Sequence, residues 1–244
     1  VVKNKPAQSM QPDLFSDFSS CQSFETINKD YVFIDNFGAL ENLVKDLQTS
    51  KLISFNCNEV QGKLIGISFS SEKGKADFVP LYEESEENIK RVNLLKEIFE
   101  NENITKVVYD LKTEKHILSR YACSIKGNCF DVQLAHYLLD SEVSHKVDFL
   151  SEKYLSYRMA DGDSLTKECA KSLQTSVLKM CKSQFSDYCS EIADVLFQLK
   201  DILETELKNN DLYSLFVDME LPLVDVLFSM EQNGVRIDSA ELAE

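Results

Sequence analysis

Cysteines and histidines are the residues whose types first suggest chemistry in this chain. There are seven cysteines and three histidines. The number of cysteines is odd and no two are spaced Cys-x-x-Cys, so the sequence favours neither a zinc site nor a disulfide framework. Reduced, buried thiols in a cytoplasm are the better interpretation. The cysteines are Cys21, Cys57, Cys123, Cys129, Cys169, Cys181 and Cys189.

The histidines and one acidic run are the next candidates. His116, His136 and His145 lack the spacing of a metal site, and surface or helix-packing roles are expected for them. A nucleophilic pair of Cys57 and His116 stays open, although only composition supports it. Four glutamates lie between residues 83 and 87, and we interpret them as negative charge at the start of the following helix rather than as a metal site.

The strands that would position a site are predicted from short β-prone runs. Three such runs with glycines in their connections are typical of an antiparallel meander. They cover residues 51–56, 63–70 and 75–81. A strand of the buried type at 104–109 is expected to run parallel to the first of them, because a helical segment separates the two.

Helical spacing of apolar residues fills most of the remaining chain. Residues 38–48 and 87–100 each carry an apolar stripe, and so do residues 131–140. The stripe in 87–100 consists of Ile89, Val92, Leu95, Ile98 and Phe99. A further stripe contains Ile192, Val195, Leu196, Leu199, Ile202 and Leu203. The sequence therefore predicts an α/β domain with a mixed sheet and a helical C-terminal half.

Composition excludes several classes of protein. The 244 residues include 41 Asp and Glu against 26 Lys and Arg, which gives a net charge of −15. That charge argues against a free-standing nucleic-acid binder, which normally carries a basic face. Apolar residues make up 43% of the chain, enough for a packed core. No apolar run reaches the ~18 residues of a membrane helix, and the first twenty residues carry no secretory signal.

Five segments together resemble a known family. The run "MELPLVDVLFSMEQNGVRID" (219–238) resembles the helix and turn that open the polymerase domain of bacterial DNA polymerase I. Upstream, four segments follow the order and rough spacing of the 3′–5′ proofreading exonuclease domain of that family. These are "KLISFNCNE" (51–59), "KVVYDLKTEKHIL" (106–118), "FDVQLAHYLLD" (130–140) and "YCSEIADV" (188–195). The resemblance covers about residues 29–244 and implies an RNase H-like 3′–5′ exonuclease fold.

The resemblance also implies a site of four carboxylates and one tyrosine. Such exonucleases hold two divalent metals, and hard cations need several carboxylate oxygens. In this chain the family's Asp-x-Glu pair falls on Asn56 and Asn58, and Ile192 stands where the third motif has Asp. Glu114 replaces the Asp of the second motif, and Tyr188 matches the tyrosine that orients the attacking water. Three of the four negative charges are absent, so we expect these five positions to be vestigial, with no metal bound.

Neighbouring acids are not expected to rebuild the site. Glu59 follows Asn58 on a strand, and alternation points it to the opposite face. Asp194 and Glu191 lie about 200° and 100° from Ile192 around a helix. Asp110 could point inward, but it stands where the family has Asn. Simpler roles are expected for three residues: Ile192 in the core, Tyr188 in packing or hydrogen bonding, and Cys57 pointing into the core.

These observations predict three regions. Residues 1–28, rich in Ser, Gln and Asp, are expected to be a linker that follows a 5′-nuclease domain absent from this chain. Residues 29–210 are expected to form a degenerate 3′–5′ exonuclease-like domain. Residues 211–244 are expected to form the first helix of a polymerase domain. Because the chain starts at Val1 and stops inside an apparent helix, we expect it to be a fragment.

The expected function is that of an inactive proofreading domain. It would act as a structural scaffold for the DNA-polymerising domain in replication and repair, in a monomeric, cytoplasmic protein that reaches DNA through its parent polymerase. The parent would use magnesium, whereas the fragment would need no cofactor. Two alternatives stay open: an active exonuclease with a remodelled site around Glu114, Asp110 and Glu191, and a module that binds single-stranded DNA without cutting it.

Overall fold

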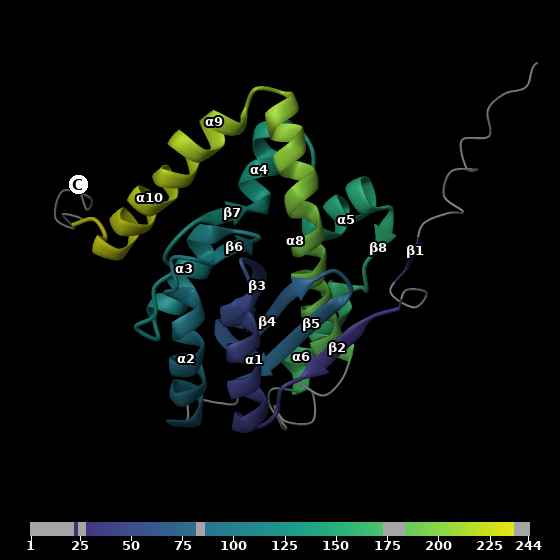
Figure 1. Ribbon diagram of the computed structural model, residues 1–244, viewed down its shortest axis with the longest axis vertical. Coiled ribbons are helices and arrows are strands. Elements are labelled where there is room, and N and C mark those ends of the chain that lie inside the picture. Colours follow the sequence, from purple (N-terminus) through teal and green to yellow (C-terminus); the bar gives the residue numbers. More distant parts are fainter. Residues whose placement is uncertain (1–21, 24–27, 82–85, 173–183, 237–244) are drawn as a thin grey trace, which may run out of the picture.

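A six-stranded mixed sheet forms the centre of the molecule, with the strand order β2-β5-β4-β3-β6-β7 (Figure 1). The computed structural model describes residues 22–23, 28–81, 86–172 and 184–236. The strands of this sheet are β2 (Asp30–Phe33), β3 (Leu52–Val60), β4 (Lys63–Glu72), β5 (Lys75–Pro80), β6 (Thr105–Val108) and β7 (Cys129–Asp131). The helices are α1 (Phe37–Thr49), α2 (Glu86–Phe99), α3 (Leu111–Ser119), α4 (Val132–Leu139), α5 (Val147–Leu155), α6 (Gly162–Ser172), α8 (Gln184–Asn209), α9 (Tyr213–Leu215), the π-helix η2 (Phe216–Glu220) and α10 (Leu221–Asn233).

The meander and the parallel strand predicted from the sequence are confirmed. β3 pairs antiparallel with β4, β4 pairs antiparallel with β5, and β3 pairs parallel with β6. The β3–β4 connection is a tight turn in which Gln61 and Gly62 have φ values of 53° and 75°. Such a pair of positive φ values matches the twist of a hairpin, and glycine adopts one without strain.

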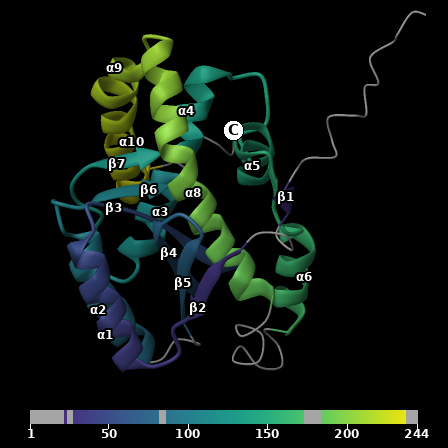
Figure 2. The ribbon, with the colours of Figure 1, turned by 45° about the vertical axis from the view of Figure 1, so that its right-hand side comes forward.

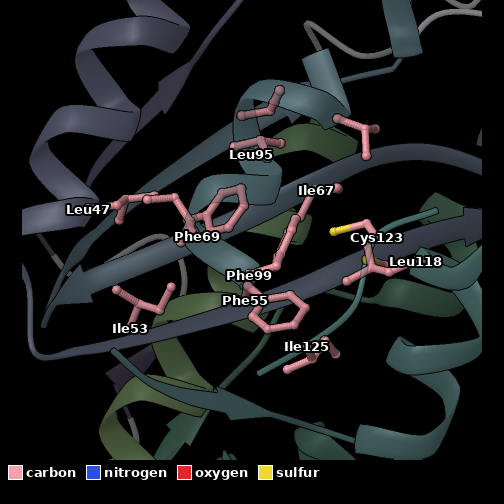
Figure 3. Close-up of a cluster of buried hydrophobic side chains, with 14 of the residues drawn as sticks. Leu47, Ile53, Phe55, Ile67, Phe69, Leu95, Phe99, Leu118, Cys123 and Ile125 are labelled. Carbon is pink, nitrogen blue, oxygen red and sulfur yellow. The ribbon is translucent and has the colours of Figure 1, made fainter. Parts of the chain in front are cut away.

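One face of the sheet is covered by α1 and α2, and its core contains an aromatic cluster. Phe55 of β3 and Phe99 of α2 meet edge to face with ring centroids 4.9 Å apart, and Phe69 of β4 lies 5.8 Å from Phe99 (Figure 3). The apolar stripe expected on α2 needs one correction. Ile89 is 57% exposed, because it lies on the outer side of the first turn, away from the buried Val92 and Leu95.

The opposite face of the sheet is covered by the 26-residue helix α8 (Figure 2). Its inner side buries Val195, Leu196 and Leu199, as the helical spacing predicts. Asp194 is also buried, and its carboxylate accepts hydrogen bonds from the Tyr31 hydroxyl (3.0 Å) and the Gly74 amide (2.9 Å). These bonds compensate the buried charge and fix α8 to β2 and to the β4–β5 turn.

The sequence did not predict three very short strands. β7 has only three residues and pairs parallel with β6, at one edge of the sheet. Its last residue, Asp131, accepts hydrogen bonds from the amides of Leu111 and Leu134, both at 2.8 Å, and so caps the start of α4 while holding the start of α3. A second, parallel pair joins β1 (Gln22–Ser23) to β8 (Tyr157–Arg158).

The three predicted regions stay a prediction, because no observation tests their boundaries. Most of the expected linker 1–28 lies outside the described residues, as do two of the four glutamates between 83 and 87 and the end of the segment 219–238. Within the described ranges, no helix is both long and apolar enough to cross a membrane.

Gly66 should be required for packing between β4 and β5. A Cβ atom added there would lie 2.3 Å from the Phe78 ring and 2.8 Å from the Val79 carbonyl oxygen. We therefore expect Gly66→Ala to lower the free energy of unfolding by about 1–3 kcal/mol. At Gly38, in the first turn of α1, an added Cβ would make ordinary contact, and Gly38→Ala should be neutral or stabilising by about 0.4–1 kcal/mol. Urea unfolding measures both, and equal effects would contradict this packing.

Candidate functional site

Three of the five predicted site residues line one cleft. Asn56 comes from β3, while Tyr188 and Ile192 come from successive turns of α8, and together they border a cleft of about 440 Å³. The far wall is formed by α5 and by the segment that leads into α6. It carries four acidic residues and one lysine: Asp148, Glu152, Asp161, Asp163 and Lys146. Packing of α8 across the sheet therefore brings together positions that are more than 130 residues apart in sequence.

Asn56 and Asn58 form a hydrogen-bonded amide pair. Residues two apart on a strand point to the same face, and the Asn56 Nδ2 donates to Asn58 Oδ1 at 2.8 Å. The Asn58 amide in turn donates to the Asn56 carbonyl oxygen (3.0 Å) and to Ser68 Oγ (3.2 Å). Asn58 is only 6% exposed. Two carboxylates at these positions would repel each other, whereas two amides satisfy each other.

Glu114 does not line the cleft, which corrects the expectation that it lies beside Asn56 and Ile192. It is 4% exposed, and both of its carboxyl oxygens lie 3.1 Å from the backbone amide of Cys57, which donates to them. β6 pairs with β3 only as far as Ser54, so Glu114 supplies the acceptor that the neighbouring strand no longer offers. Burial raises the pKa of the Glu114 carboxyl to about 8.

The acids of the alternative one-metal site each have a separate structural role. Asp110 caps α3 by accepting from the Thr113 amide at 3.1 Å. Glu191 is fully buried and accepts from the Tyr157 hydroxyl and from the Ala160 amide. Among the described residues, no three His, Cys, Asp or Glu side chains converge in a way that could hold a metal ion.

Tyr188 and Ile192 differ in how closely they follow the sequence prediction. Tyr188 packs tightly, since a Cβ added to Gly162 would lie 2.0 Å from its hydroxyl oxygen. Burial raises the pKa of Tyr188 to about 12. Ile192 is half-buried and packs beside the cluster of Val195 and Leu196 while its outer side lines the cleft. The expectation of a core residue is therefore only partly correct, because the cleft replaces protein on one side.

A Cys57–His116 nucleophile is not assembled. Cys57 is buried in the core that faces α1 and α2, as expected. His116 turns to α10, where its Nε2 lies 2.6 Å from Glu231 and its Nδ1 lies 3.1 Å from the Gln232 amide nitrogen. Four of the described cysteines, Cys57, Cys123, Cys129 and Cys169, are free thiols.

Sequence reasoning missed the acidic wall of the cleft. Asp148 and Glu152 belong to α5, and Asp161 and Asp163 flank Gly162. The Asp-Gly-Asp spacing was the one visible signal for the second pair.

A larger cleft of about 730 Å³ lies between β7 and α10, but its lysines are paired with carboxylates. The pairs are Lys115 with Asp225, Lys126 with Glu100 and Lys200 with Glu204.

The donor set does not fit the two-metal centre of the family. The two amides bind each other, Glu114 binds the Cys57 amide, and Ile192 offers no donor atom. Hard divalent cations take oxygen ligands and need negative charge around them. At the four aligned positions the only ionisable group is a carboxyl whose raised pKa keeps it mainly protonated at neutral pH.

The raised pKa of Glu114 predicts a pH effect on stability. Its folded pKa of about 8 exceeds the ordinary 4.5, so the folded protein holds this proton more tightly than the unfolded chain does. The stability linked to that proton is therefore lost as the pH rises from about 4.5 to about 8. We expect Glu114→Gln to be more stable than the parent at about pH 8, by about 1–3 kcal/mol, and close to it at about pH 5.

Urea unfolding at the two pH values measures this difference. Glu72→Gln is the matched control, because Glu72 lies on β4 and pairs with Lys75 at the surface. If Glu114→Gln and the parent lose the same stability between the two pH values, the buried protonated carboxyl is refuted.

This chain is similar to known proteins over most of its length. A family model described as 3′–5′ exonuclease matches residues 31–208. DNA polymerase I of Borreliella burgdorferi is 28% identical over 99% of this chain and 28% of its own length. DNA polymerase I of Pseudomonas aeruginosa is 28% identical over 86% of this chain and 24% of its own length. The chain thus spans about a quarter of the length of these curated relatives.

A solved structure gives the fold independently. Escherichia coli RNase D, an exoribonuclease involved in structured RNA processing, matches 82% of this chain and 51% of that chain with a TM-score of 0.67 and 15% identity. The mixed sheet and its covering helices therefore have the RNase H-like exonuclease fold that the sequence resemblance implied. Since the family model spans most of its length, the chain belongs to the 3′–5′ exonuclease domain family of bacterial DNA polymerase I.

Proposed function

We propose that this domain does not cleave DNA and serves as a structural support for the DNA-polymerising part of a DNA polymerase I. The observation that carries the proposal is the amide pair of Asn56 and Asn58, which stands where the family has two metal-binding carboxylates. Glu114 and Ile192 support it, because neither supplies a charged oxygen to the cleft. Without ligands for two metals, the attacking water and the leaving oxygen have nothing to activate or stabilise them.

The packing of α10 on α3 supports the scaffold role. α10 belongs to the region 211–244, which we propose is the first helix of the polymerase domain. It packs along α3, where Glu231 pairs with Lys112 at 2.7 Å and with His116 at 2.6 Å, and Asp225 pairs with Lys115. The Phe228 ring lies edge-on to the His116 ring, with centroids 4.9 Å apart. The helix that would begin the polymerase domain thus rests on the helix that carries Glu114.

The outer side of the same segment supports contact with further protein. Met219, Leu223, Val226 and Met230 recur at helical spacing and are 64%, 45%, 53% and 62% exposed. An apolar row of this length on a surface helix marks an interaction site. We propose that the polymerase domain covers it within the same chain. DNA contact, magnesium use and a cytoplasmic role in replication and repair then belong to that whole polymerase, and the exonuclease-like domain itself uses no cofactor and forms no oligomer.

Single-stranded DNA binding is disfavoured by the cleft wall. Phosphate contacts depend on lysine and arginine. Among the described residues, four acidic side chains line this cleft, and Lys146 is the only basic one. A fluorescence titration with labelled single-stranded DNA at low and moderate salt tests this alternative. Salt-dependent binding that Lys146→Ala weakens would favour the DNA-binding module.

The nuclease assay tests the proposal directly. We expect no degradation of 3′-labelled single-stranded DNA in magnesium or manganese, because the charge that would hold the metal pair is missing. The DNA polymerase I of Pseudomonas aeruginosa, to which this chain is similar, can be run beside it for comparison. Activity that survives repurification and disappears in Glu114→Ala would overturn the proposal and favour a remodelled one-metal site.

Restoring the family residues should create metal-dependent stability. We expect the triple variant Asn56→Asp, Asn58→Glu and Ile192→Asp to be less stable than the parent without metal, by about 2–4 kcal/mol, because it places repelling charges in a half-buried site. Manganese should raise the melting temperature of the triple variant, since binding to the folded state stabilises it. The parent should melt at the same temperature with and without manganese. A rise in the parent that a chelator reverses would mean that a metal site survives.

A further inference from the structure

Two histidines that are nine residues apart in the sequence lie in direct contact. His136, in the last turn of α4, has no exposed surface, and its Nδ1 lies 2.8 Å from the Nδ1 of His145 in the loop before α5. On the other side of the ring, the Lys153 ammonium of α5 lies 3.3 Å from His136 Nε2. Lys153 Nζ is also 3.5 Å from Asp140, the residue that follows α4. The helix-packing role expected for His136 is confirmed, since its ring packs against Phe149 and Tyr154 of α5, and the contact with His145 is an addition to it.

The direction of these hydrogen bonds follows from the lysine. An ammonium group can only donate, so His136 Nε2 accepts from Lys153 and carries no proton. A neutral His136 then has its proton on Nδ1 and donates to His145 Nδ1, whose proton must be on Nε2. If either histidine takes up a second proton, two N–H groups face each other at one of the two contacts. The chain of bonds from Lys153 through His136 to His145 is therefore intact only while both rings are neutral.

These bonds anchor a helix that has little support of its own at its start. α5 has nine residues, and its N-cap residue, Lys146, makes no side-chain capping bond. Short helices without caps are marginally stable alone. His145 immediately precedes Lys146, so its bond to the buried His136 fixes the point at which α5 begins. Lys146, Asp148 and Glu152 line the cleft, which makes α5 one of its walls.

We propose that Lys153, His136 and His145 form a pH-sensitive latch that holds α5 against α4 and loosens this wall of the cleft on acidification. The groups that face His136 are Lys153 and Tyr154 from α5, Asp140 from the end of α4, and His145. Phe149 of α5 and Tyr137 of α4 place their rings beside the two imidazoles. From α8, the buried side chains of Leu199 and Leu203 belong to the apolar cluster against which Phe149 and Tyr154 pack.

The sign of the effect follows from the surroundings of His136. Burial, and then the positive charge of Lys153, lower the pKa of His136 to about 4, below the ordinary 6.5. The released state therefore binds a proton more readily than the latched state does. Stability of the latch is fully present above about pH 6.5 and is lost as the pH falls toward 4. At about pH 5.5, one pH unit below the ordinary value, the opening equilibrium should shift by about tenfold.

Hydrogen exchange of the 244-residue protein tests the proposal. Protection factors of the backbone amides in 147–155 are compared at about pH 7.5 and about pH 5.5, with those of 40–49 in α1 as an internal reference. We expect α5 protection to fall by about tenfold at the lower pH while α1 protection stays constant. In His136→Gln the side chain does not titrate, so most of the fall between the two pH values should disappear.

Two further variants complete the design. His145→Ala removes the acceptor and should lower α5 protection at both pH values. His116→Asn is the matched control, because His116 faces α10, and this variant should show the same fall as the parent. Unchanged α5 protection in the parent, or an equal fall in the parent and in His136→Gln, would overturn the latch.

Discussion

The packing of α8 across one face of the sheet is the constraint on which the site depends. Its apolar stripe supplies the driving force, since the buried side chains of Val195, Leu196 and Leu199 leave water together. Two buried carboxylates set its position: Asp194 accepts from Tyr31 and Gly74, and Glu191 accepts from Tyr157 and Ala160. A buried carboxylate is tolerated only with such partners, so these bonds define where the helix lies. This position of α8 places Tyr188 and Ile192 in the same cleft as Asn56.

On the proposed function, the same packing would let the fold persist without the metal ligands of the family. Each of the four aligned positions has a local contact that needs no ion. Asn56 and Asn58 satisfy each other, Glu114 caps a strand amide that lacks a neighbouring strand, and Ile192 adds apolar contact beside the α8 core. Clustered carboxylates destabilise an empty site by mutual repulsion, and this chain has none at these four positions except Glu114. The polar groups at these positions therefore form hydrogen bonds within the protein, where a nuclease would need negative charge to bind metal.

Much of the fold was predictable from the sequence because it depends on local periodicity. The meander, the parallel strand β6 and the apolar stripe of α8 follow from the spacing of apolar residues and from the turn at Gly62. The three-residue strand β7 and the two-residue pair β1–β8 were not predictable, because such short segments carry no periodic signal.

The resemblance located Asn56, Tyr188 and Ile192 in one cleft. It could not show that Glu114 turns to the Cys57 amide, since that depends on where β6 stops pairing. The His136–His145 contact was hidden for a similar reason, because a loop and not a regular spacing brings the two rings together.

The most direct test of the central claim is the binding of manganese in a crystal of this protein. Anomalous difference density collected from crystals soaked in manganese would reveal any ion in the cleft beside Asn56, Tyr188 and Ile192. We expect no peak there, because the two amides, the protonated Glu114 and an isoleucine do not provide the charged oxygen ligands that the ion requires. One or two ordered manganese ions at that position, held by Glu114 or by the acidic wall of the cleft, would contradict the claim that the site has lost its metals.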